Sequence, residues 1–129
     1  MAKVFIVDHS IHDTDRACKL LGKDGIEVEV CHTGNAAEQI LMARGQEFAA
    51  ILVLWELPGM PTTFDLLSNC QRRWPELLVV VMSGELDVSL AARTHVLGAK
   101  DFLEKPLDSA RLRSCLQELL AERSPESPL

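Results

Sequence analysis

The chain has 129 residues, 47% of them apolar and 25% charged, which is the size and composition of one globular domain rather than of a disordered segment. Nineteen acidic and thirteen basic residues give a formal net charge of -6, and no run of Lys or Arg is long enough to grip a phosphate backbone. Direct binding to nucleic acid is therefore not expected.

The four cysteines lie far apart in apolar segments and form no C-x-x-C pair, which favours reduced core thiols over a zinc site. The first residues, MAKVFIV, have the pattern of a strand and lack a cleavage motif, so they do not resemble a signal peptide. Every apolar segment is shorter than the roughly 18 residues that a membrane span needs. We expect a soluble, cytoplasmic protein without a membrane partner.

The first part of the chain alternates between strand and helix patterns. A short apolar strand at residues 4–7 precedes a helix that ends near Gly22. Residues 26–31, IEVEVC, alternate between apolar and charged side chains. This alternation is typical of a strand at or near the edge of a sheet.

The middle of the chain contains the most apolar stretch. Asn35 is predicted to cap a helix over residues 36–44, with Glu38 completing a capping-box-like pattern. Residues 49–54 then form an unbroken apolar run, followed shortly by Pro58 and a glycine. Such a run predicts a strand buried on both faces, in the middle of a parallel sheet.

The remaining elements continue the alternation. In chain order we expect a helix over 64–74 capped by Thr62 or Thr63, a strand at 77–82, a helix at about 86–97, a short strand at 101–104, and a last helix capped by Asp108 or Ser109. Five strands alternating with five helices predict an α/β fold with a parallel sheet and right-handed βαβ crossovers.

Chemically informative positions occur where the predicted strands end. These positions are Asp8, His9, Leu54, Glu56, Ser83 and Lys105. In an open parallel sheet, ligands and chemistry gather at the carboxyl ends of the strands. Leu54 matters most, because an aliphatic side chain supplies no nucleophile, proton or metal ligand.

Four motifs resemble the receiver domain of two-component response regulators: V-D-H after the first strand, L-P-G-M after the third, M-S-G after the fourth, and D-F-L-E-K-P around the fifth. The resemblance covers about residues 3–122. It implies a flavodoxin-like three-layer α/β/α sandwich, whose five-stranded parallel sheet has the order 2-1-3-4-5. It also implies a receiver-like domain over residues 1–122, followed by a tail or linker start at 123–129.

In that family, two acidic residues after the first strand hold Mg²⁺, and an aspartate at the end of the third strand takes a phosphoryl group from a histidine kinase. A Ser or Thr after the fourth strand and a Lys after the fifth then bind the phosphoryl oxygens. The resemblance assigns these roles to Asp8, Ser83 and Lys105, whereas His9 replaces the second acidic residue. Leu54 occupies the position of the phospho-acceptor.

Leucine cannot be phosphorylated, so the resemblance implies a degenerate phospho-acceptor pocket without a catalytic residue. Mg²⁺ binding is expected to be weak or lost, because His9 and Leu54 do not offer the oxygen ligands that Mg²⁺ prefers, and no other cofactor is expected. A transition-metal site formed by His9, His12 and Asp8 remains an alternative to two solvated histidines at a helix start.

The remaining pocket residues are expected to rearrange. Lys105 should pair with Asp8, with Glu56 as the second choice, because a half-buried cation without a counter-charge is costly. The resemblance places the family's switch and output positions at Ser83 and Phe102. An output surface frozen in one state is one interpretation, and a simple core role for Phe102 is the other.

These observations predict a non-enzymatic, phosphorylation-independent protein-interaction module. A signalling protein or an output domain is the expected partner, and a homodimer through the fourth helix, fifth strand and fifth helix is another arrangement. The alternative is a working phosphorelay receiver that is phosphorylated at an unconventional residue, with Glu56 as its candidate acceptor.

Overall fold

The computed structural model describes residues 3–85 and 87–122, so the expected tail at 123–129 lies outside the described residues. Five strands alternate with five helices, and one turn of 3-10 helix, Gly45–Glu47, precedes the third strand. The strands are β1 (Lys3–Val7), β2 (Glu27–Cys31), β3 (Ala50–Leu54), β4 (Leu78–Ser83) and β5 (Ala99–Glu104). The helices are α1 (Ile11–Gly22), α2 (Gly34–Arg44), α3 (Thr63–Arg73), α4 (Val88–Val96) and α5 (Ser109–Glu122).

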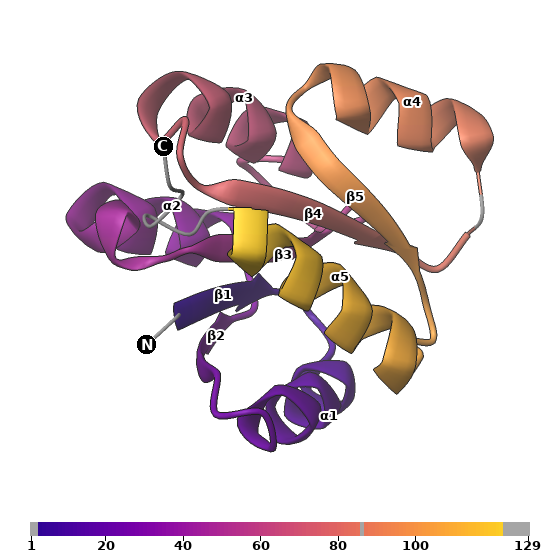
Figure 1. Cartoon of the computed structure of the whole chain (residues 1–129). Helices are drawn as coiled ribbons and strands as arrows, with labels where there is room; N and C mark the ends of the chain where they lie inside the picture. The colour runs from indigo at the N-terminus through magenta and orange to yellow at the C-terminus, as the bar shows by residue number, and fades with distance from the viewer. Residues whose placement is uncertain (1–2, 86, 123–129) are drawn as a thin grey trace.

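The five strands form one parallel sheet in the order β2-β1-β3-β4-β5. Figure 1 shows α1 and α5 on one face of the sheet and α2, α3 and α4 on the other. The predicted three-layer sandwich and strand order are confirmed, and residues 26–31 supply the expected edge strand, β2. The loops that follow β1, β3, β4 and β5 therefore meet at one edge of the sheet.

Strand β3 is buried along its whole length. Ile51 and Val53 pack among side chains of α2 and α3, whereas Ala50 and Leu52 pack among side chains of α1 and α5. Because successive side chains of a strand point to opposite faces, a strand that is covered on both faces is apolar at every position. This explains the unbroken apolar run at 49–54.

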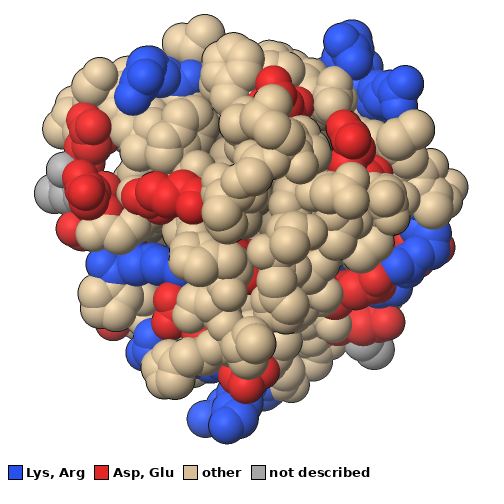
Figure 2. Space-filling model, turned by 180° about the vertical axis from the view of Figure 1, so that it is seen from behind, with Lys and Arg blue, Asp and Glu red and all other residues tan. Residues whose placement is uncertain are grey.

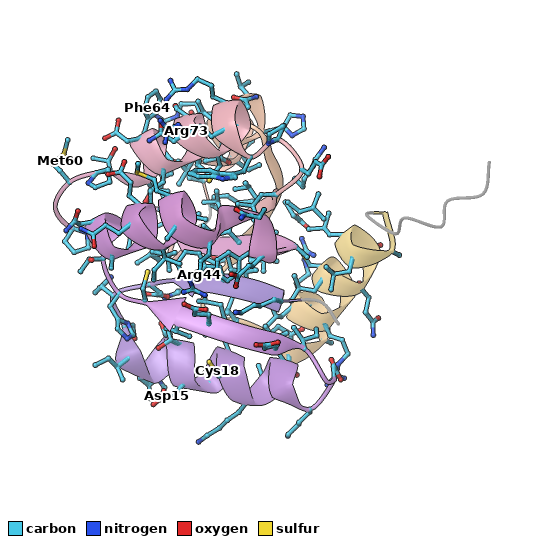
Figure 3. The ribbon with its side chains drawn as sticks, turned by 90° about the vertical axis from the view of Figure 1, so that its left-hand side faces the viewer. Asp15, Cys18, Arg44, Met60, Phe64 and Arg73 are labelled. Atoms are coloured by element: carbon cyan, nitrogen blue, oxygen red, sulfur yellow. The ribbon has the colours of Figure 1, made fainter. Side chains whose placement is uncertain are left out.

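Charged side chains cover the exposed edge strand β2. Glu29 accepts a hydrogen bond from Arg44 of α2, and Nζ of Lys3 lies 3.3 Å from Oε1 of Glu29. Figure 3 shows Arg44 between α2 and β2. The hydrogen bond from Arg44 is the main cause that lowers the pKa of Glu29. Such charges protect an edge strand from pairing with another chain.

The predicted start of α2 is wrong. The helix begins at Gly34 and its cap is Thr33, whose side chain accepts a hydrogen bond from a backbone amide one turn further on. Asn35 lies inside the first turn, so it does not form the expected capping box with Glu38. Gly34 suits its place because an ideal Cβ there would overlap the carbonyl oxygen of Pro61.

Two other boundaries also differ from the predictions. Helix α4 begins at Val88, after the cap residue Asp87, rather than near residue 86. Strand β5 begins at Ala99 rather than at Asp101. Its pairing with β4 passes from Ala99 directly to Asp101 and leaves Lys100 as an extra residue. This irregularity interrupts the alternation of side chains, which is why the pattern pointed to a shorter strand.

Two helix starts match the predictions. Thr62 caps α3, and its side chain forms a reciprocal capping box with Asp65. At the start of α5, Oδ2 of Asp108 accepts a hydrogen bond of 2.9 Å from the amide of Arg111. Each cap is the first of the two candidates that the sequence offered.

Within residues 3–85 and 87–122, no helix combines the length and the apolar character that crossing a membrane requires. Figure 2 shows the molecule from behind, with Lys and Arg mainly at the margins of this face and acidic side chains scattered over it. The side chains described there form no continuous basic patch on this face. This distribution agrees with the formal net charge of -6.

Candidate functional site

An ion-paired cluster occupies the edge of the sheet where β1 and β5 end. The ammonium of Lys105 donates hydrogen bonds to Oδ2 of Asp8 and, at 2.7 Å, to Oδ2 of Asp13. Asp8 is 1% exposed, and the side chain of Lys105 is 13% exposed. The predicted pairing of Lys105 with Asp8 is confirmed, whereas Glu56, the second choice, binds a different partner.

The backbone around the start of α1 holds Asp8 in place. Oδ1 of Asp8 accepts a hydrogen bond of 3.0 Å from the amide of Ser10, and the Ser10 hydroxyl accepts one of 3.2 Å from the amide of Asp13. On the other side, Nδ1 of His32 lies 2.9 Å from the backbone carbonyl oxygen of Asp8. Both carboxylate oxygens of this buried side chain therefore have partners, as burial requires.

Asp13 is a member of the cluster that the sequence prediction did not include. It is the third residue of α1 after the cap Ser10. Side chains of a helix tilt toward its amino terminus, so a carboxylate at this position points back toward the strand ends. An acidic residue three positions after a serine cap is the signal that could have placed Asp13 beside Asp8.

The cluster shifts the pKa values of Lys105 and Asp13 toward their charged forms. Burial by itself would lower the pKa of Lys105, but hydrogen bonds to Asp13 and Asp8 outweigh it, and the net pKa is raised. The pKa of Asp13 is lowered mainly by its hydrogen bond from Lys105, against the opposite effect of burial. Lys105 and Asp13 therefore stay charged at neutral pH.

A second network links the ends of β3, β4 and β5. Ser83 is fully buried, and its hydroxyl donates a hydrogen bond of 2.7 Å to Oε2 of Glu56. The same hydroxyl accepts a hydrogen bond of 3.2 Å from the amide of Glu85. The backbone carbonyl of Ser83 accepts one of 2.7 Å from the amide of Lys105. The sequence placed Glu56 and Ser83 at the same edge but did not predict their contact.

Leu54 belongs to the hydrophobic core at the end of β3. It is 3% exposed and packs on the α2 and α3 side of the sheet, where Trp55 and Phe102 also pack as partly buried side chains. The carbonyl oxygen of Leu54 accepts a hydrogen bond of 2.7 Å from the hydroxyl of Thr63. For Phe102, this packing supports the interpretation as a core aromatic.

The two histidines at the start of α1 lie toward solvent. The His9 side chain is 54% exposed with Nδ1 at 3.8 Å from Asp8, and the His12 side chain is 89% exposed with Nδ1 at 3.4 Å from Asp13. Across residues 3–85 and 87–122, no three or more His, Cys, Asp or Glu side chains are grouped so that they could hold a metal ion. This arrangement favours two solvated histidines over a transition-metal site at His9, His12 and Asp8.

Comparison with known proteins agrees with this strand-end geometry. The family model of the response regulator receiver domain matches residues 4–117. The chain belongs to this family. Its expected fold and the two-component signalling role of receiver domains thus apply to the chain, and the receiver domain covers nearly all of its length.

The relatives of this receiver domain are longer proteins. The transcriptional regulatory protein FixJ of Azorhizobium caulinodans is 40% identical over 119 residues, which cover 87% of this chain and 54% of that protein. FixJ of Bradyrhizobium diazoefficiens is 26% identical over 122 residues, which cover 95% of this chain and 58% of that protein. The chain therefore spans little more than half the length of these curated relatives.

A solved structure supports the fold of the receiver domain. A response regulator receiver domain protein from Clostridium thermocellum superposes with a TM-score of 0.87, at 20% identity, over 95% of this chain and 97% of that one. At this level of identity the likeness concerns the fold alone.

Replacing the cluster's only lysine tests its contribution to stability. The variant Lys105→Met leaves the carboxylate of Asp8 buried without its cation, and the free energy of unfolding should fall by about 3–5 kcal/mol. Urea unfolding at neutral pH measures this loss. Lys100→Met, which changes an exposed lysine of β5, is the control and should stay within about 0.5 kcal/mol of the parent protein. Equal stability of both variants would contradict the assigned role of the cluster.

The lowered pKa of Asp13 makes stability depend on pH. Because the folded-state pKa lies below the unfolded value of about 3.9, the contribution of Asp13 is fully present above that value. It is lost as the pH falls through the folded-state pKa. The melting temperature of Asp13→Asn should therefore be lower than that of the parent at pH 7, with the difference shrinking toward pH 2. Asp15→Asn alters an exposed side chain, which Figure 3 shows on the side of α1 away from the sheet, and the melting curve of this variant should follow the parent at every pH. If the melting temperature of Asp13→Asn were lower than that of the parent by the same amount at every pH, the ionisation of Asp13 would not be the cause of the difference.

Proposed function

We propose that this receiver domain is a phosphorylation-independent protein-interaction module and not an enzyme. One observation carries the proposal. At the end of β3, where the family keeps its acceptor aspartate, the chain has Leu54, a core side chain that is 3% exposed. An alkyl side chain cannot attack phosphorus, so no acyl phosphate can form at this position.

The charges around Leu54 support the same conclusion. A bound Mg²⁺ would need several oxygen ligands at the strand ends. The ammonium of Lys105 already binds Asp8 and Asp13, and the side chain of His9 lies mostly in solvent. A divalent cation would therefore have to displace an ammonium from a buried carboxylate. These residues do not fit Mg²⁺ well, and we infer that its binding is weak or lost.

Glu56 carries the second candidate function, a working phosphorelay receiver. It is an exposed residue, and its Oε2 lies 2.7 Å from the hydroxyl of Ser83, a group type that the family uses to bind phosphoryl oxygens. Transfer of a phosphoryl group also needs a cation at the acceptor. Among the ion pairs of the described residues, none involves Glu56, and the ammonium of Lys105 is directed at Asp8 and Asp13. We therefore prefer the interaction module.

The surface that we assign to a partner is made by α4, β5 and α5. Val88 and Val96 of α4 are 81% and 76% exposed. Between β5 and the start of α5 lies a hollow of about 370 Å³, whose lining includes Phe102 and Leu107. Exposed apolar side chains on α4, which packs against β5, together with a hollow at the end of β5, favour protein contact. We propose that a second copy of the chain binds here, with a signalling protein or an output domain as the other occupants to be tested.

Intact mass measurement tests the central proposal. After incubation with acetyl phosphate and Mg²⁺, the mass of the chain should be unchanged, because Leu54 offers no acceptor oxygen. A receiver domain that has its acceptor aspartate, treated in parallel, serves as the positive control. A stoichiometric phosphoryl adduct on the parent chain that hydroxylamine removes would overturn the proposal. If that adduct were absent from Glu56→Gln, the second candidate function would replace it.

Sedimentation at micromolar concentrations tests the assigned surface. The parent chain should associate, and Val88→Glu and Val96→Glu should shift it to monomer, because each places a charge in the apolar interface. Met42→Glu alters an α2 side chain that is 61% exposed on a different helix, and it should leave association unchanged. A monomeric parent chain, or an equal effect of Met42→Glu, would rule out this homodimer.

A further inference from the structure

Glu56 and Ser83 form a contact between an exposed group and a fully buried one. Glu56 lies in the loop after β3 and is exposed, whereas Ser83 ends β4 with no exposed surface. Their hydrogen bond of 2.7 Å joins the loop between β3 and α3 to the loop between β4 and α4. A change at the surface of the first loop can therefore reach the second.

The chemistry of a hydroxyl makes this contact directional. Ser83 has one O–H to donate, and it donates this hydrogen to the carboxylate of Glu56. A hydrogen bond to a charged acceptor is stronger than one to a neutral acceptor, so the carboxylate fixes the orientation of the hydroxyl. A lone pair of the same oxygen then accepts the amide of Glu85, at 3.2 Å. The position of Glu85 thus depends on the rotamer that Glu56 selects.

The cap residue of α4 lies two positions after Glu85 in the chain. Oδ1 of Asp87 accepts hydrogen bonds from the amides of Ser89 and Leu90, at 2.9 and 3.2 Å, and so caps α4. Val88 is the first residue of that helix and lies in the surface that we assign to a partner. An unanchored loop before a cap lets the first turn of a helix open more readily.

We propose that Glu56 is a latch: its carboxylate orients the Ser83 hydroxyl, and the hydroxyl holds the backbone amide of Glu85, ahead of α4, in one position. This inference rests on the proposed function, because it supplies the group that fixes the interaction surface without phosphorylation. Glu56 acts through Ser83 and is a positioning residue. The latch makes the loop after β3 a place from which a bound partner can alter α4.

Amide hydrogen exchange of the whole chain, resolved by residue with NMR, tests the latch. Glu56→Ala removes the acceptor and should speed exchange of the Glu85 amide and of the first turn of α4 about tenfold, the size expected for losing one charge-assisted hydrogen bond. Glu56→Gln keeps a neutral acceptor oxygen and should show a smaller effect. Glu85→Gln is the matched control: it removes one negative charge from the same region, but only the backbone amide of Glu85 belongs to the latch, so exchange should not change.

The serine end supplies an independent measurement. Ser83→Ala should speed exchange at the same amides, and the double variant with Glu56→Ala should exchange no faster than Ser83→Ala, because Glu56 acts only through the Ser83 hydroxyl. Unchanged exchange at the Glu85 amide in Glu56→Ala would overturn the latch. Additive effects in the double variant, or faster exchange spread evenly over β1 and β3, would also overturn it.

The outcomes separate the latch from the proposed function. If the exchange experiment fails while acetyl phosphate leaves the mass unchanged, the latch is wrong and the interaction module stands. A hydroxylamine-sensitive phosphoryl adduct would remove the interaction module whatever the exchange data show, since the exchange experiment uses no phosphate donor.

Discussion

The ammonium of Lys105 joins the two ends of the site. It follows β5, the last strand of the sheet order, yet it binds Asp8 after β1 and Asp13 in α1. A buried carboxylate without a cation is far costlier than a complete pair, so the position of each member constrains the others. The start of α1 and the end of β5 are therefore held in fixed positions relative to each other, although strands β3 and β4 lie between β1 and β5 in the sheet. A pocket organised in this way is filled by its own side chains.

Lys105 also belongs to the second network through its backbone. Its amide donates to the carbonyl of Ser83, whose hydroxyl binds Glu56. One residue thus contributes its charged side chain to the contacts of β1 and α1, and its amide to the contacts of β3 and β4. Leu54, which is apolar and buried in the core, adds no charge to either network. The fold of a receiver domain is retained, and its polar groups satisfy one another.

The fold and much of the site were predictable from the sequence. The unbroken apolar run of β3 and the alternation in β2 define which strands are central and which lie at the edge, because burial dictates both patterns. Pairing of Lys105 with Asp8 followed from the cost of an unpaired cation. The roles of Asp13 and Glu56 did not follow. The first depends on how the Ser10 cap turns the start of α1, and the second on the path of the loop after β3, which no periodicity specifies. The cap at Thr33 was missed because Asn35 and Glu38 imitate a capping box.

The tight fit of Gly34 against the carbonyl of Pro61 has a mechanical consequence. With no space for even a methyl group between them, the first turn of α2 supports the far end of the loop that carries Glu56, and the Thr62 cap anchors the same loop to α3. That loop is thus braced at its end by contacts with two helices. Helices α2 and α3 therefore form a fixed frame for the loop that places Glu56 beside Ser83.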